Sequence, residues 1–160
     1  MIDAPRPPIL LVEDDDGHAR LLERTLRRAG LGHRIVRVAD GQDALDYLAV
    51  ADGLADTDQH PRPGLILLDI RMPRLDGFEV LAHVRSDPVH RHTPIIMLTS
   101  TDNQHEVNRA YELGASGYVV KPVNVDLFTD RVITLGRFLD LVELPDAAHA
   151  GSDYGRHPAG

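Results

Sequence analysis

Side chains that could bind a metal ion or a phosphoryl group follow four short apolar runs in this sequence. Glu13 and Asp14 follow the first run, Asp69 follows the third, Thr99 follows the fourth and Lys121 follows the fifth. Carboxylates held close together cannot all ionise unless one pKa rises or a cation lies between them. If the fold brings these run ends together, we therefore expect a cation among the carboxylates.

The residue types favour phosphoryl chemistry on a magnesium ion. Carboxylate oxygens, with no cysteine in the chain and no convergent histidines, favour Mg²⁺, which accepts a few carboxylates and keeps several waters. Lys121 could meet one phosphoryl oxygen, and the Thr99 hydroxyl could donate to another. Asp69, a single carboxylate in the middle of the cluster, is the candidate nucleophile, because carboxylates form acyl phosphates in enzymes.

The elements that must position these side chains alternate along the chain. Apolar runs of strand length lie at 9–12, 35–38, 65–68, 95–98 and 118–120, with helical patterns between them. This alternation predicts an α/β domain, a doubly wound parallel sheet of five strands with five helices. In the strand order 2-1-3-4-5, Glu13, Asp14 and Asp69 would enter one crevice at the carboxyl ends of neighbouring strands. The second apolar run, at 35–38, is not followed by a side chain that suggests metal or phosphoryl binding.

Capping residues and glycines set the expected helix bounds. The expected signals are Gly30 after the first helix, Asp40 and Asp76 at the starts of the second and third, Asp102 or Asn103 and Gly114 around the fourth, and Asn124 before the fifth, which ends before Pro145. Residues 51–64 predict a surface loop. We expect residues 1–7 to form an N-terminal extension, 8–145 the domain and 146–160 a disordered tail.

The amino-acid composition restricts the expected partners and the expected compartment of the protein. The chain has 17 basic and 25 acidic residues and a net charge of −8, which argues against nucleic-acid and membrane partners. Residues 1–8 lack an apolar stretch of signal length, and no 18 apolar residues run together. We therefore expect a cytoplasmic protein.

Five segments, in order, resemble the receiver domain of two-component response regulators, the CheY-like family with a flavodoxin-like fold. They are LLVEDD at 10–15, LLDIRMP at 67–73, LDGFEVL at 75–81, LTS at 98–100 and GASGYVVKP at 114–122. The resemblance covers roughly residues 8–145. It implies that Asp69 accepts a phosphoryl group from a phosphohistidine of a sensor histidine kinase, so the chain would assist its own phosphorylation and dephosphorylation without being an enzyme in the usual sense.

The resemblance also implies roles for individual residues. Asp14, Asp69 and the backbone carbonyl of Arg71 would ligate Mg²⁺, and Glu13 would act mainly through water. Arg71 places a bulky cation two residues after Asp69, at a position that tunes the lifetime of the phosphoryl group in this family. The resemblance therefore does not predict that lifetime.

Thr99 and Tyr118 would form the conformational switch, and the Lys121–Pro122 bond would be cis. The long loop before residue 65 and the end of the fifth helix resemble single-domain regulators that partner bacterial phytochromes. The output would be contact with a downstream protein or a phosphotransfer protein through helix four, strand five and helix five.

Simpler interpretations stand beside these. Asp15 or Asp16 could cap the first helix, Thr99 could open a turn, and Tyr118 could be a core aromatic. His90 and His92 are expected to be solvated surface residues.

Two other function classes remain. A Mg²⁺-dependent phosphohydrolase of the haloacid dehalogenase type would have an aspartate where Arg71 stands, and it would need room for a cap domain. A nucleotide-binding module would need a phosphate-binding glycine motif, which the sequence lacks.

The fifth helix carries more apolar residues than one face can hold. Its stripe of Phe128, Val132, Leu135, Leu139 and Val142 should face the sheet. A second set, Leu127, Ile133, Phe138, Leu141 and Leu144, lies off that stripe. We expect this second set to contribute to a homodimer or partner surface.

Overall fold

A computed structural model describes residues 6–52 and 60–145, which form a parallel five-stranded sheet between two layers of helices. The strands are β1 (Ile9–Val12), β2 (Ile35–Val38), β3 (Leu65–Leu68), β4 (Ile95–Thr99) and β5 (Gly117–Val120). Their order is β2-β1-β3-β4-β5, and every neighbouring pair is parallel. The predicted flavodoxin-like doubly wound fold is confirmed.

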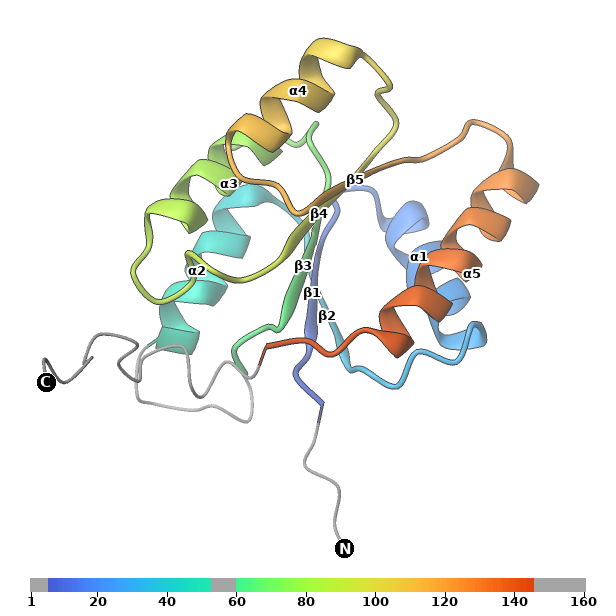
Figure 1. Cartoon of the computed structure of the whole chain (residues 1–160), viewed down its shortest axis with the longest axis horizontal. Coiled ribbons are helices and arrows are strands. Elements are labelled where there is room, and N and C mark those ends of the chain that lie inside the picture. The colour runs from blue at the N-terminus through green and yellow to red at the C-terminus, as the bar shows by residue number, and fades with distance from the viewer. Residues whose placement is uncertain (1–5, 53–59, 146–160) are drawn as a thin grey trace, which may run out of the picture.

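Five helices connect the strands and cover both faces of the sheet. They are α1 (Asp16–Arg28), α2 (Gly41–Asp52), α3 (Gly77–Ser86), α4 (Gln104–Glu112) and α5 (Val125–Leu141). Figure 1 shows α2, α3 and α4 on one side of the sheet and α1 with α5 on the other. Each side holds its own apolar core, so the sheet is buried on both faces.

The two central strands, which precede the predicted site residues Glu13, Asp14 and Asp69, are buried along their whole length. All four residues of β1 and all four of β3 are buried, with alternate side chains entering opposite cores. Burial of one such aliphatic side chain stabilises the fold by roughly 1.5–3 kcal/mol. Residues that follow β1 and β3 therefore start from fixed positions.

The predicted helix ends are confirmed where the structure describes them. Asp15 caps α1 by accepting from the His18 N–H at 2.8 Å, and Asp76 and Glu79 form a capping box at α3. Helix α4 begins after Asn103, and Asn124 caps α5. Gly30 and Gly114, at φ +91° and +103°, follow α1 and α4 in the left-handed conformation that ends helices.

Two local predictions are wrong. The loop expected from residue 51 begins later, because α2 continues through Ala51, whose side chain is buried, to Asp52. His90 is not solvated: it is 2% exposed, and its Nε2 lies 3.3 Å from the Leu48 carbonyl oxygen. Packing of the α3–β4 segment against α2 explains both. Residues 146–160, and most of residues 1–7, lie outside the described part of the chain.

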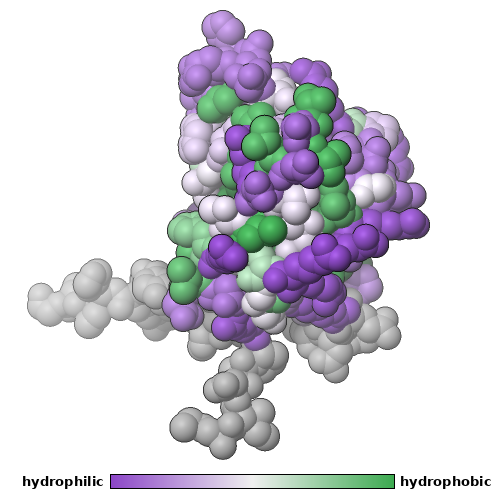
Figure 2. All heavy atoms as spheres, turned by 90° about the vertical axis from the view of Figure 1, so that its right-hand side faces the viewer, coloured by the Kyte–Doolittle hydropathy of each residue, from purple (hydrophilic) through white to green (hydrophobic). Residues whose placement is uncertain are grey.

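Helix α5 exposes part of its second apolar set. Leu127 and Phe138 are each 57% exposed and Leu141 is 82% exposed, whereas Ile133 and Leu144 are half-buried. Figure 2 shows hydrophobic side chains interspersed among hydrophilic ones on the face that carries α1 and α5. The main stripe packs inward as predicted, except that Val142 lies just beyond the helix and is half-buried.

None of the helices within residues 6–52 and 60–145 has both the length and the apolar character needed to span a membrane.

Candidate functional site

Three carboxylates meet at the carboxyl ends of β1 and β3. One oxygen from each of Glu13, Asp14 and Asp69 lies within 4.8 Å of the others. The adjacent strands fix this arrangement, since the Asp69 N–H donates to the Val12 carbonyl at 3.1 Å. Glu13 and Asp69 are buried and Asp14 is exposed, so the cluster has one open side.

Lys121 follows β5 and enters the same cluster from the other side. Its Nζ donates to Glu13 Oε2 at 2.9 Å and lies 3.3 Å from Asp69 Oδ2. Burial alone would lower the pKa of this lysine, but attraction to Asp69 and Glu13 outweighs burial and raises it. Lys121 therefore stays an ammonium ion although it is only 6% exposed.

For Glu13, burial has a larger effect on the pKa than the attraction of the neighbouring positive charge. Burial raises the pKa of its carboxyl group, and the ammonium of Lys121 compensates only in part. A further positive charge beside Glu13 would therefore be stabilising. The open side at Asp14 is where such a charge could enter.

Close backbone packing holds Asp69. The Ile70 N–H donates to Asp69 Oδ1 at 2.7 Å, and the Gly77 N–H donates to the Ile70 carbonyl at 2.7 Å. A Cβ on residue 77 would lie 2.3 Å from the Asp69 carbonyl oxygen, so only glycine allows this approach. The start of α3 thus fixes the backbone at the candidate nucleophile.

Thr99 ends β4 and is 1% exposed. Its Oγ1 is buried and has no hydrogen-bond partner among the described residues. Such a hydroxyl costs stability, and groups of this kind call for a functional explanation. The Thr99 hydroxyl is therefore free to donate to an oxygen atom that enters the site.

A second network lies beside the site, between the β3–α3 segment and α4. The Arg71 side chain is paired with Glu106 at 2.9 Å, and the Thr101 hydroxyl donates to Glu106 at 2.5 Å. The Tyr118 hydroxyl donates to the Thr101 carbonyl at 2.8 Å. Burial, reinforced by the Glu106 and Asp69 carboxylates, raises the pKa of Tyr118.

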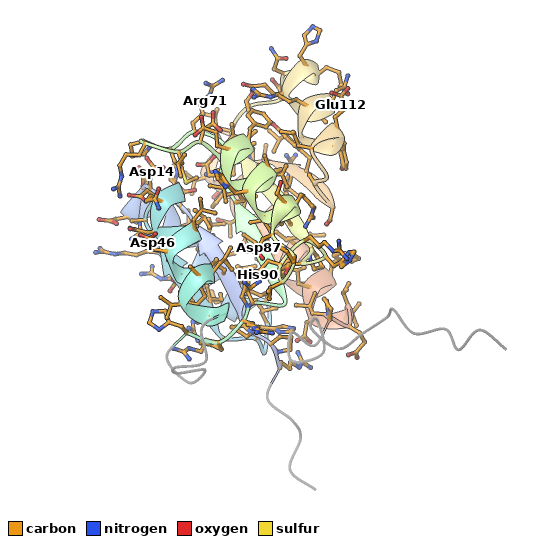
Figure 3. The ribbon with its side chains drawn as sticks, turned by 90° about the vertical axis from the view of Figure 1, so that its left-hand side faces the viewer. Asp14, Asp46, Arg71, Asp87, His90 and Glu112 are labelled. Carbon is orange, nitrogen blue, oxygen red and sulfur yellow. The ribbon has the colours of Figure 1, made fainter. Side chains whose placement is uncertain are left out.

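A cavity of about 560 Å³ opens next to the carboxylates. Asp14, Arg71 and Phe78 contribute to its wall, and the Arg109 guanidinium stacks over the Phe78 ring at 4.3 Å. Figure 3 shows Asp14 and Arg71 near one end of the molecule, well separated from Asp87 and His90. The space beside the acids is large enough for a small anionic group.

The structure brings four of the predicted site residues together, namely Glu13, Asp14, Asp69 and Lys121. Thr99 and Tyr118 lie on the next two strands, β4 and β5. The Arg71 side chain turns away toward Glu106, and its backbone carbonyl stays a predicted ligand. The predicted cis bond between Lys121 and Pro122 is wrong, because the described residues contain no cis peptide.

Sequence reasoning missed one residue at this edge. β2 was expected to end without an informative side chain, but Arg37 reaches from β2 to the backbone of Glu13. Its position inside an apolar strand was the available signal, because an arginine there must find partners for its five N–H groups.

The donor set fits a divalent cation. The three acids offer hard oxygen ligands, their shared negative charge exceeds what Lys121 neutralises, and one side is open. No cysteine is present in the chain to favour a softer metal.

A doubly wound sheet with three acids, a hydroxyl and a lysine at its carboxyl edge defines the class of α/β domains that bind ligands at the carboxyl ends of parallel strands. The family model described as "Response regulator receiver domain" matches residues 9–133, and the chain belongs to this family. It is therefore a response regulator receiver of two-component signalling. The match gives no support to the phosphohydrolase alternative.

Relatives agree with this assignment. Response regulator Rcp1 of Synechocystis sp. is 35% identical over 150 residues, which cover 92% of this chain and 100% of Rcp1. The crystal structure of the Mn²⁺-bound form of Rcp1 shares 33% identity at a TM-score of 0.78, covering 88% of this chain and 99% of that chain. The phosphorylated cyanobacterial phytochrome response regulator RcpA gives the same identity, TM-score and coverage.

Proposed function

We propose that Asp69 accepts a phosphoryl group from a phosphohistidine of a sensor histidine kinase. The observation that carries the proposal is the Lys121 ammonium, 3.3 Å from the Asp69 carboxylate inside a cluster of three acids. This arrangement places a nucleophile, a fixed cation and a site for a second cation in contact. The chain acts as a phosphoryl acceptor and not as an enzyme that turns over free substrates.

Asp69, Lys121 and Thr99 have separate roles in the proposed phosphoryl transfer. An Asp69 oxygen forms the new O–P bond while the P–N bond to the donor histidine breaks, and the imidazole leaves with the bonding electron pair and takes up a proton. The Lys121 ammonium and the Thr99 hydroxyl hold the transferred oxygens. Such transfers depend mainly on positioning and charge stabilisation.

Mg²⁺ is the proposed cofactor, and when bound it neutralises charge on the phosphoryl oxygens. Asp14, Asp69 and the backbone carbonyl of Arg71 are the proposed ligands, with Glu13 acting mainly through water. The exposed Asp14 leaves one side of the cluster open, which suits an ion that keeps several waters.

Thr99 and Tyr118 form the proposed switch. The unpartnered Thr99 hydroxyl moves toward the phosphoryl group, and Tyr118 leaves the Thr101 carbonyl and turns inward. The face of α4, β5 and α5 would then present a changed surface to a downstream protein, a phosphotransfer protein or a second copy of this chain.

We also propose that the protein works in the cytoplasm and that its cognate kinase is of the phytochrome type. The support for the kinase type is the similarity to Rcp1 and to the phytochrome response regulator RcpA over most of both chains. The test is phosphotransfer from an autophosphorylated phytochrome-type kinase, compared with a chemotaxis-type kinase. Equal or faster transfer from the chemotaxis kinase would reject the phytochrome assignment and leave the receiver function intact.

Acetyl phosphate and Mg²⁺, followed by intact mass spectrometry, test the acceptor. The wild-type protein should gain one phosphoryl group that is stable in acid and labile in base, and Asp69→Asn should gain none. Asp46→Asn, at an exposed position on α2, is the matched control and should behave as wild type. An adduct that persists in Asp69→Asn would overturn the assignment.

A further inference from the structure

Arg37 makes three hydrogen bonds to the acidic turn after β1. Its Nε and Nη2 donate to the Glu13 carbonyl oxygen at 3.0 and 2.8 Å, and its Nη1 donates to Asp16 Oδ1 at 2.7 Å. The Arg37 side chain is 24% exposed, so these bonds are partly shielded from water. One guanidinium therefore joins β2, the residue after β1 and the first residue of α1.

This contact completes the attachment of Glu13. The Glu13 N–H already donates to the Val38 carbonyl at 3.2 Å, so both backbone polar groups of Glu13 are bonded to β2. Asp14 lies between Glu13 and the cap residue Asp15. Among the described residues, none forms a hydrogen bond or ion pair with the Asp14 carboxylate. The orientation of the Asp14 side chain depends on how this short turn is held.

We propose that Arg37 is a positioning residue for the metal and phosphoryl site, and that it sets the turn that aims Glu13 and Asp14 at Asp69. The inference rests on the proposed function. Arg37 does not touch the phosphoryl group: it acts through the Glu13 carbonyl and Asp16. The planar fork of a guanidinium can span these two acceptors, whereas a lysine ammonium at the same position cannot reach both with equal geometry.

Charge and geometry predict opposite effects of removing Arg37. Loss of a positive charge next to three carboxylates should by itself strengthen the binding of a cation. Loss of the clamp should weaken it, as outer partners of metal ligands typically contribute between tenfold and hundredfold in affinity. The sign of the change in Mg²⁺ affinity therefore separates positioning from simple electrostatics.

The experiment compares Arg37→Met and Arg37→Lys with Arg85→Met by calorimetric Mg²⁺ titration. Arg85 is the matched control, because it also donates to backbone carbonyls, those of Gly114, Arg91 and Thr93, but at the opposite end of the sheet. The free energy of unfolding is measured for each variant without metal. The rate of phosphorylation by acetyl phosphate is measured as a function of Mg²⁺ concentration.

We expect both Arg37 variants to bind Mg²⁺ about tenfold more weakly. Their half-saturating Mg²⁺ concentration for phosphorylation should rise by a similar factor, while the maximal rate stays near that of wild type. Arg85→Met should lose stability and keep the wild-type Mg²⁺ affinity. This split between affinity and maximal rate is not expected from a role in stability alone.

Three results would overturn the inference. They are unchanged or tighter Mg²⁺ binding in Arg37→Met, wild-type Mg²⁺ binding in Arg37→Lys, and failure of both variants to fold, which would assign Arg37 to the fold alone. If the wild-type protein bound no Mg²⁺, the proposed function itself would be rejected, so the two failures are distinguishable.

Discussion

The buried Lys121 is the residue on which the site depends most. It is the only lysine among the 160 residues, and it contacts both Glu13 and Asp69. Removing the lysine would leave two buried carboxylates without their fixed cation, a change that typically costs about 3–5 kcal/mol. Arginine is not equivalent at this position, because its guanidinium is larger and planar, whereas the lysine ammonium is a compact point charge.

The pKa of Lys121 is directly testable. Attraction to Asp69 and Glu13 outweighs burial and raises the pKa above the usual value of 10.5. Because the folded-state pKa is the higher one, the contribution of Lys121 to stability is complete below 10.5 and is lost as the pH rises through the folded-state value. In Glu13→Gln, burial persists while one attraction is gone, so the pKa should fall.

A single lysine allows a clean measurement. NMR titration of its side-chain carbons reports the pKa without overlap from other lysines. A lower pKa in Glu13→Gln than in wild type is the expected result, and Glu23→Gln, on α1, is the control. An equal or higher pKa in Glu13→Gln would show that the ion pair does not govern Lys121.

At the scale of elements, the site depends on how α3 meets the end of β3. Gly77 is the first residue of α3, and its missing side chain lets the helix start contact the Asp69 backbone. The capping box of Asp76 and Glu79 fixes where that helix begins. The backbone of Asp69 is therefore held by a helix start that follows it in the sequence.

Gly77→Ala tests this dependence. The added Cβ would lie 2.3 Å from the Asp69 carbonyl oxygen and 2.8 Å from the Ile70 Cα, so the backbone at Asp69 must move. We expect a loss of about 1–3 kcal/mol in the free energy of unfolding, the usual range for overpacking. Phosphorylation by acetyl phosphate should slow as well.

Gly117→Ala is the control for that variant. A Cβ on Gly117 would meet Ile96 at 3.5 Å, an ordinary contact, and the residue begins β5 at the far end of the sheet from the acids. Urea unfolding and acetyl phosphate assays on both variants give the comparison. Wild-type phosphorylation in Gly77→Ala would mean that α3 does not position Asp69.

At the scale of the whole molecule, the parallel sheet concentrates charge at one edge. Carboxylates directly follow β1 and β3, and the parallel alignment of these strands places the carboxylates at the same end of the sheet. Burial raises the pKa of the Glu13 carboxyl group more than the Lys121 ammonium lowers it, and the nearby Asp69 carboxylate raises it further. A bound cation should offset this cost of holding Glu13 ionised.

Mg²⁺ should therefore stabilise the folded protein. A ligand that binds only the folded state adds roughly 2.7 kcal/mol at a concentration one hundred times its dissociation constant. Asp14→Asn should lose most of this gain. Without metal, its stability should equal or slightly exceed that of wild type, because Asp14 is exposed and one like charge is removed.

Urea unfolding with and without Mg²⁺, at matched ionic strength, measures this effect. Asp46→Asn should keep the full metal-dependent gain, since its carboxylate lies on α2, outside the acid cluster. Equal stabilisation of the wild-type protein and Asp14→Asn by Mg²⁺ would contradict a metal site at the strand ends.

The sequence by itself determined the sheet, the helix ends and the site residues with conspicuous positions. Strands with continuous apolar runs are recognisable because both faces of a parallel sheet are buried. Caps such as Asp76 and Asn124 are recognisable because helix starts need acceptors for unpaired N–H groups. Glu13, Asp69 and Lys121 were predictable because each is a charged residue that directly follows an apolar strand.

Only the tertiary structure decided which side chains reach across to other elements. Arg37 clamps the Glu13 backbone, His90 is buried against α2, and Arg71 pairs with Glu106. Long side chains have many rotamers, and their choice depends on partners far away in sequence, which local periodicity does not encode. The hydrophobic pattern of the sequence thus shows which charged residues follow each strand, and tertiary packing determines which of these side chains contact one another.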